Sequence, residues 1–205
     1  MKTSVIPAID EKAVELAHRT LINGGLVAFP TDTVYGLGCL VNNRDAIDRL
    51  YQVKERSQSK AIAVLIAEIA DLQGLIVEVP PLAASLAARF WPGALTLVFP
   101  KHPGLPENLS PLPTIGIRMP DHAFARSLMR RTGPLATTSA NISGQNNPVS
   151  AEEVLAQLDG RIELVIDGGP ASSGIPSTVV DCTLPQPRVL RIGAYTPEQL
   201  GLTEN

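Results

Sequence analysis

Short apolar segments of strand length alternate with amphipathic segments of helix length along the chain, and this alternation constrains the fold more than any other feature. We expect strands at residues 26–29, 38–41, 61–67, 95–99, 114–119, 135–138, 164–166, 178–181 and 189–192. We expect helices at residues 11–23, 43–54, 82–90, 123–131 and 150–158. Strands and helices that alternate in this way pack as a sheet covered by helices. We therefore predict an α/β fold, with one twisted mixed sheet and helices packed on it.

The size and charge of the chain limit the classes of protein to consider. A length of 205 residues with 44% hydrophobic content fits a single domain with a sizeable core. The net charge of −3 argues against a broad nucleic-acid surface but allows a local basic pocket. Cys39 and Cys182 lie in or beside apolar segments and predict buried free thiols. No apolar run suits a signal peptide or a membrane span, so we expect a cytoplasmic protein without membrane association.

The apolar segment at residues 26–29 leads directly into a turn rich in hydroxyl groups and glycine. Gly36 and Gly38 would allow the backbone to approach a ligand closely, and Thr31 and Thr33 would supply directional hydrogen-bonding groups. An ordinary polar turn after a strand would explain the same residues. The turn therefore indicates a small-molecule site without establishing one.

Three cations, Lys54, Arg56 and Lys60, follow an expected helix and precede an expected buried strand. The planar fork of arginine and the mobile point charge of lysine suit the oxygens of a polyphosphate. The alternative is a solvated helix end, where cations complement the negative pole of the helix dipole. The sequence has no Walker-type G-x-x-x-x-G-K motif, so a phosphate site here would depend on these side chains.

A second polar turn follows the expected strand at residues 135–138. Ser139 and Asn141 are two positions apart, so in an extended segment their side chains would project the same way and could hold one ligand group. A plain polar loop is the alternative. Arg118 and Arg191 each interrupt an apolar segment, where an arginine is usually either paired or extended toward solvent.

Together these motifs resemble the YrdC family of threonylcarbamoyl-AMP synthases, which serve the threonylcarbamoyladenosine modification of tRNA. The resemblance runs nearly end to end and is carried by Lys54, Arg56, Lys60 and residues 30–38, 92–96, 117–120, 138–144, 176–181 and 190–193. It implies a YrdC-like sheet that forms a concave, positively charged cavity. It also implies a nucleotidyltransferase that converts ATP, L-threonine and bicarbonate to threonylcarbamoyl-AMP and pyrophosphate. Mg²⁺ would accompany ATP, and we expect no metal site held by the protein.

The resemblance further implies roles for individual residues. The nucleotide phosphates would be held by Lys54, Arg56, Lys60 and Arg191. The nucleotide and its reacting end would be held by Thr114, Ser139 and Asn141. Threonine would be bound by Thr33, Arg118 and Ser177, with Arg118 facing the substrate carboxylate. The residues expected to carry catalysis are Lys54, Arg56, Ser139 and Asn141.

The chain departs from the family pattern in two respects. Ser57 and the pair Ala61-Ile62 stand where the family commonly has prolines and Pro-Leu, so we expect a more mobile loop. The chain resembles the short form, a single domain over residues 1–205 with its core at about 7–193 and no additional C-terminal domain.

Downstream tRNA threonylcarbamoyl-transferase proteins would receive the labile product, and tRNA itself is a further candidate partner. One alternative is a relative without synthase activity that binds RNA or nucleotide. Another is a carbamoyl transfer of the hydrogenase-maturation type, which normally brings extra domains and cysteines.

Overall fold

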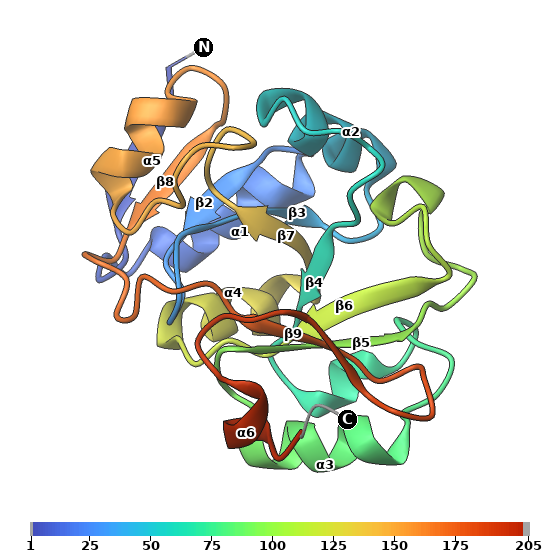
Figure 1. Cartoon of the computed structure of the whole chain (residues 1–205). Helices are drawn as coiled ribbons and strands as arrows, with labels where there is room; N and C mark the ends of the chain where they lie inside the picture. The colour runs from blue at the N-terminus through green and yellow to red at the C-terminus, as the bar shows by residue number, and fades with distance from the viewer. Residues whose placement is uncertain (1, 203–205) are drawn as a thin grey trace.

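The computed structural model describes residues 2–202 and has one mixed sheet with helices on both of its faces (Figure 1). The strands are β1 (Ser4–Pro7), β2 (Val27–Phe29), β3 (Gly36–Leu40), β4 (Ala63–Leu65), β5 (Leu95–Pro100), β6 (Thr114–Arg118), β7 (Leu135–Ser139), β8 (Leu164–Asp167), β9 (Thr178–Asp181) and β10 (Arg188–Arg191). The helices are α1 (Ala13–Ile22), α2 (Arg44–Val53), α3 (Pro81–Phe90), α4 (Ala123–Thr132), α5 (Ala151–Leu158) and α6 (Pro197–Leu200), with 3₁₀ turns η1 (Ile69–Leu72) and η2 (Glu107–Leu109).

The ten strands follow the order β1-β8-β2-β3-β7-β4-β6-β5-β9-β10. Strands β1 and β2 run parallel to β8, β4 runs parallel to β6, and β5 runs parallel to β9. The remaining neighbours are antiparallel. The predicted α/β fold with a mixed sheet is confirmed.

Two hydrophobic cores lie on opposite faces of the sheet. In β2, Val27 and Phe29 belong to the core beneath α1 and α4, whereas Ala28 belongs to the core covered by α2, α3 and α5. This alternation follows from the pleat, which directs successive side chains to opposite faces. Strands of this kind are buried on both faces, so their sequences are continuous apolar runs.

Two of the expected helices begin at side-chain caps. The side chain of Asn43 accepts a hydrogen bond from the backbone N–H of Ala46 (3.0 Å) at the start of α2, and Ser150 caps α5 through Glu153 (3.3 Å). A helix was expected at residues 11–23, but α1 begins only at residue 13 and Asp10 is not its N-cap. The Asp10 carboxylate instead accepts from the N–H of Lys12 (2.8 Å), in the turn that precedes the helix. No helix within residues 2–202 is long and apolar enough to cross a membrane.

Strand β1 was not predicted, because its apolar stretch is only Val5 and Ile6. It is an edge strand whose side chains are largely exposed, and it is held by backbone pairing with β8. The apolar run at residues 61–67 contributes only Ala63–Leu65 to the sheet, although Ile62 and Ile66 are also buried. Cys39 and Cys182 are buried free thiols, as predicted.

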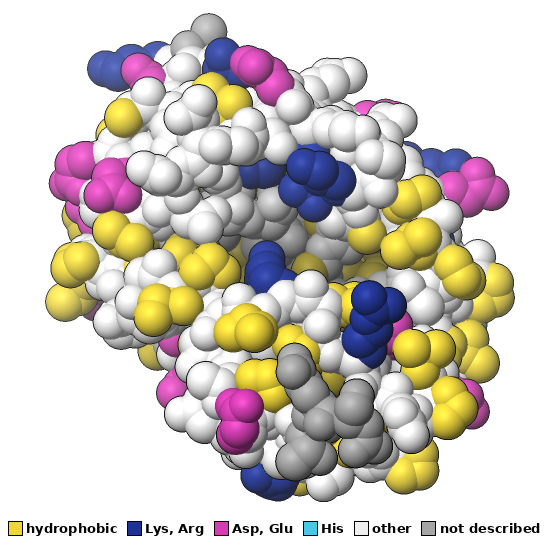
Figure 2. Space-filling view, in the orientation of Figure 1, with side chains coloured by type: hydrophobic (Ala, Val, Ile, Leu, Met, Phe, Trp, Pro, Cys, Tyr) yellow, Lys and Arg dark blue, Asp and Glu magenta, His cyan; other side chains and the backbone are white. Residues whose placement is uncertain are grey.

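One part of the sheet is left open on the face that α1 and α4 cover. The buried core beneath these helices contains no described residue of β5, β6 or β9. Apart from Arg118 at the end of β6, the side chains that these strands direct to this face are small, among them Thr96, Val98, Gly116 and Val179. The fold therefore leaves a hollow over β5, β6 and β9, and Figure 2 shows Lys and Arg side chains gathered around it.

Candidate functional site

The hollow is a cavity of about 360 Å³, lined by strands and loops from separate parts of the chain. Its floor is formed by β4, β5, β6 and β9. Its walls include the turn after β2, the loop after α2, the end of β7 and the end of β10. Hydroxyl groups line it at Thr31, Thr33, Thr96, Thr114, Thr137, Thr138, Ser139 and Ser177. A lining of small hydroxyl and apolar groups with a few charges is typical of small-molecule sites.

Three arginines from separate parts of the chain face this cavity. Arg56 follows α2, Arg118 ends β6, and Arg191 ends β10. Burial lowers the pKa of all three guanidiniums. The charge of Arg56 further lowers the pKa of Arg191, and the charge of Arg191 further lowers that of Arg118. The three cations therefore act on one another through the same cavity, which favours anionic ligands.

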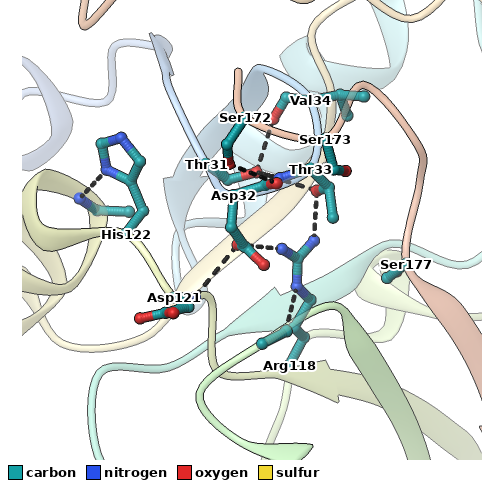
Figure 3. Close-up of polar contacts among 12 residues, drawn as sticks. Thr31, Asp32, Thr33, Val34, Arg118, Asp121, His122, Ser172, Ser173 and Ser177 are labelled. Carbon is teal, nitrogen blue, oxygen red and sulfur yellow. Dashed lines mark hydrogen bonds and ion pairs between the residues drawn. The ribbon is translucent and has the colours of Figure 1, made fainter. Parts of the chain in front are cut away.

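Arg118 is held by three partners around its guanidinium (Figure 3). Its Nε donates to the carbonyl oxygen of Gly93 (2.9 Å), one terminal nitrogen donates to Thr33 Oγ1 (2.7 Å), and the other donates to the carboxylate of Asp32. A guanidinium has five N–H donors, so one N–H on each terminal nitrogen stays uncommitted by these bonds. Two such donors are what a bidentate carboxylate accepts.

The hydroxyl protons of Thr31 and Thr33 are both committed within the turn after β2. Thr31 Oγ1 donates to the carbonyl oxygen of Val34 (2.7 Å), which can only accept. The 3.0 Å contact between the two threonine hydroxyls must therefore use the proton of Thr33. Since Arg118 also donates to Thr33 Oγ1, one acceptor lone pair is all that Thr33 retains for a ligand.

The hydroxyl groups of Thr96 and Ser177 differ from that of Thr33, because together they retain a hydrogen-bond donor for a ligand. Their hydroxyls lie 2.8 Å apart, and Arg191 donates to both the carbonyl oxygen (2.8 Å) and the hydroxyl (3.1 Å) of Ser177. Whichever hydroxyl donates to the other, one O–H of the pair is left over. This side of the cavity can therefore donate one hydroxyl hydrogen bond to a ligand.

The structure places Lys54 away from the cavity lining. Lys54 is 1% exposed, and its ammonium donates to the carbonyl oxygens of Ser139 and Asn141 and to the side-chain oxygen of Asn141 (3.3 Å). Burial, followed by the charge of Arg56, lowers the pKa of Lys54 to about 7. Glu55, between Lys54 and Arg56, adopts a left-handed backbone conformation (φ 52°). The backbone changes direction there, and of these two cations only Arg56 lines the cavity.

Ser139 and Asn141 come together but bond to each other. The Ser139 hydroxyl donates to Asn141 Oδ1 (2.5 Å), and the Asn141 amide donates to the carbonyl oxygens of Ile142 (2.9 Å) and Gln145 (2.8 Å). Ser139 lines the cavity, whereas Asn141 is buried behind it. The two side chains were expected to project together toward a ligand. In the structure only Ser139 faces the cavity, and Asn141 supports Ser139 from behind.

The residues expected from the sequence thus fall into two groups. Those that line the cavity are Thr33, Arg56, Thr114, Arg118, Ser139, Ser177 and Arg191. Those that do not are Lys54, Asn141 and Lys60, the last of which is exposed. Sequence reasoning missed Asp32 and Thr96 as site residues, although both lie inside segments that carried the family resemblance.

Within residues 2–202, no group of three or more His, Cys, Asp or Glu side chains is placed to hold a metal ion. His122, left without a role by the sequence, is the N-cap of α4, where its Nδ1 accepts from the N–H of Ala125 (3.5 Å). The side chains that line the cavity supply hydrogen-bonding groups and positive charge.

Comparison with known proteins identifies the family of the chain. The sequence model of the Sua5/YciO/YrdC family, described as telomere recombination, matches residues 19–193. A threonylcarbamoyl-AMP synthase of Bacillus subtilis is 46% identical over 194 residues, which is 93% of this chain and 56% of the relative. The human threonylcarbamoyl-AMP synthase is 39% identical over 183 residues, 85% of this chain and 64% of the relative.

The solved structures agree with this similarity. The crystal structure of P. abyssi Sua5 complexed with L-threonine matches with a TM-score of 0.94 and 40% identity, covering 97% of this chain and 60% of that one. E. coli YciO shares the fold, with a TM-score of 0.86 at 24% identity. The chain spans 56% of the length of the Bacillus subtilis synthase and 57% of that of the Pyrococcus abyssi synthase.

Proposed function

This chain belongs to the Sua5/YciO/YrdC family, and from that membership and the cavity geometry we propose that it is a threonylcarbamoyl-AMP synthase serving tRNA threonylcarbamoyladenosine formation. The reaction would be a nucleotidyl transfer from ATP, with L-threonine and bicarbonate as the other substrates. The observation that carries the proposal is the convergence of Arg56, Arg118 and Arg191 on one cavity. This arrangement supports binding of two anionic substrates side by side.

The proposed reaction has two steps. The amine of threonine attacks the carbon of bicarbonate, and loss of water leaves a carbamate. A carbamate oxygen then attacks the α-phosphorus of ATP, a new P–O bond forms, and pyrophosphate leaves. Both reactants of the second step are anions, so the site must offset their repulsion with fixed cations and hydrogen-bond donors. Holding the reactants in line supplies most of the remaining rate enhancement.

We assign the amino acid to the end of the cavity where Arg118 lies. The two uncommitted N–H groups of Arg118 would bind the carboxylate of threonine, and the acceptor lone pair of Thr33 would take an N–H or O–H of the substrate. Ser177 with Thr96 would donate one hydroxyl hydrogen bond. Positive charge around a bound amine also lowers its pKa, which favours the neutral, nucleophilic form.

We assign the nucleotide phosphates to Arg56 and Arg191. Arg56 donates from one terminal nitrogen to the carbonyl oxygen of Ala61 (2.9 Å), while its buried Nε has no hydrogen-bond partner among the described residues. A phosphate oxygen would satisfy this donor. Thr114 and Ser139 would contact the nucleotide from the floor and wall of the cavity. Mg²⁺ would enter as part of the MgATP substrate.

Lys54 and Asn141 would support catalysis by holding Ser139 in place, because their hydrogen bonds fix the turn that carries it. Lys60 remains a candidate for phosphate binding, from the exposed loop before β4. Because an acyl adenylate is labile, tRNA threonylcarbamoyl-transferase proteins of the cytoplasm would take up the product. Direct binding of tRNA is a further part of this proposal.

The test is pyrophosphate release by the purified protein given ATP, Mg²⁺, L-threonine and bicarbonate. Each component is omitted in turn, and the nucleotide product is identified by mass. Release that requires both threonine and bicarbonate, with a product of the mass of threonylcarbamoyl-AMP, is the expected result. A folded protein that binds ATP but releases no pyrophosphate would instead indicate a relative that binds nucleotide or RNA without synthase activity.

A further inference from the structure

Asp32 lies outside the cavity lining but contacts the arginine that faces it. Its side-chain oxygen Oδ1 accepts from Arg118 Nη2 and from the backbone N–H of Asp121 (3.2 Å) (Figure 3). The two charged side chains are both largely buried, at 14% exposure for Asp32 and 7% for Arg118. A buried ion pair of this kind is sensitive to loss of either partner, because the other charge is left uncompensated.

Asp32 is the carboxylate that offsets the cost of burying Arg118. Burial lowers the pKa of Arg118, the charge of Arg191 lowers it further, and Asp32 opposes both effects. The hydrogen bond from Arg118 to Asp32 also complements those to Gly93 and Thr33. Together, these three contacts determine which N–H groups remain available for a ligand.

We propose that Asp32 is a positioning residue for the amino acid substrate, acting through Arg118 and never touching the substrate itself. The inference rests on the proposed function, since it assigns the carboxylate of threonine to Arg118. Removal of the Asp32 charge would let the guanidinium rotate away from its three-point anchor. The affinity for threonine would then fall, while the phosphate contacts of Arg56 and Arg191 would stay in place.

Main-chain contacts also anchor the turn that carries Asp32. The main-chain oxygen of Asp32 accepts from the hydroxyl of Ser172 (3.1 Å), and that of Thr33 accepts from the backbone N–H of Gly174 (2.9 Å). These backbone contacts survive any substitution of the Asp32 side chain. A variant at this position can therefore test orientation of Arg118 with the turn still anchored.

The experiment compares Asp32→Asn and Asp32→Glu with Asp121→Asn. The asparagine keeps an oxygen acceptor without the charge, and the glutamate keeps the charge but displaces it by one methylene group. Asp121→Asn is the matched control. It removes the charge of a neighbouring aspartate, and the side chain of Asp121 makes no hydrogen bond to Arg118. Threonine binding is measured by calorimetry, and the Michaelis constants for threonine and ATP are measured from pyrophosphate release.

For both Asp32 variants we expect the Kd and the Michaelis constant for threonine to rise about tenfold or more, because asparagine removes the charge that holds Arg118 and glutamate displaces it. The Michaelis constant for ATP should stay within about twofold, and Asp121→Asn should resemble the wild type. Unchanged threonine binding in Asp32→Asn, or equal losses for threonine and ATP, would overturn the inference. Wild-type protein that binds no threonine would overturn the proposed function, and this inference with it.

Discussion

The ammonium of Lys54 donates hydrogen bonds to both the main-chain and the side-chain oxygen of Asn141, 87 positions further along the chain. Its third N–H reaches the main-chain oxygen of Ser139. The three acceptors match the three donors of one ammonium group. Lys54 thus connects the end of α2 to the turn after β7, and the position of the Ser139 hydroxyl depends on this connection.

The burial of Lys54 and the nearby charge of Arg56 make stability depend on pH in a specific window. The pKa of Lys54 is lowered from 10.5 to about 7, so the folded protein releases a proton that the unfolded chain retains until about pH 10. The free energy of unfolding should therefore rise with pH between about 7 and 10, by at most about 1.4 kcal/mol per pH unit from this group. Urea unfolding at pH 7, 8 and 9 should show this rise in the wild type relative to Lys54→Met. Equal pH slopes in the two proteins would contradict the prediction.

Arg56→Ala should reduce pyrophosphate release by about a hundredfold or more, because it removes a fixed cation from the transferring phosphates. The variant should remain folded, since its one side-chain hydrogen bond is to the carbonyl oxygen of Ala61. Threonine binding should be nearly unchanged. Arg188→Ala, which removes an exposed arginine outside the cavity lining, is the control. Near-normal turnover in folded Arg56→Ala would exclude a phosphate role for this residue.

Thr31→Val should weaken threonine binding by about tenfold, because Thr33 would lose the acceptor of its proton and present a different polarity to the substrate. The loss of the bond to Val34 should also lower the free energy of unfolding by about 1–2 kcal/mol. Thr31→Ser retains the hydroxyl and should restore most of the affinity. Calorimetry and urea unfolding measure both effects. Equal threonine affinity in the valine and serine variants would show that hydroxyl polarity has no role.

Gly193→Ala should disturb both stability and nucleotide binding. A Cβ at this position would lie 2.2 Å from the carbonyl oxygen of Pro176 and 2.5 Å from the carbonyl carbon of Ser177, so the backbone must shift. The shift would move Arg191 away from Ser177, its hydrogen-bond partner. We expect a loss of about 2 kcal/mol in the free energy of unfolding and about tenfold weaker ATP binding. Thermal unfolding and ATP titration that both match the wild type would refute this account.

Local signals in the sequence predicted much of the fold. The cap at Asn43 and the apolar positions of α2 act over a few residues, so they can be read without knowledge of distant parts of the chain. Strand β1 could not be read in the same way, because it depends on backbone pairing with β8 and shows little apolar pattern of its own. The extent of β4 was likewise decided by its neighbours β6 and β7.

The sequence by itself determined the kinds of group in the site, namely cations, hydroxyls and close-approach glycines, because these are properties of residue types and of family motifs. Only the tertiary structure decided which of them share the cavity. Lys54 and Arg56 are two positions apart, yet one is buried on carbonyl oxygens and the other lines the cavity. Asp32 contacts an arginine 86 positions away. Such pairings depend on where a backbone turn directs each side chain and on which distant groups then neutralise its charge. Neither can be predicted from the neighbouring residues in the sequence.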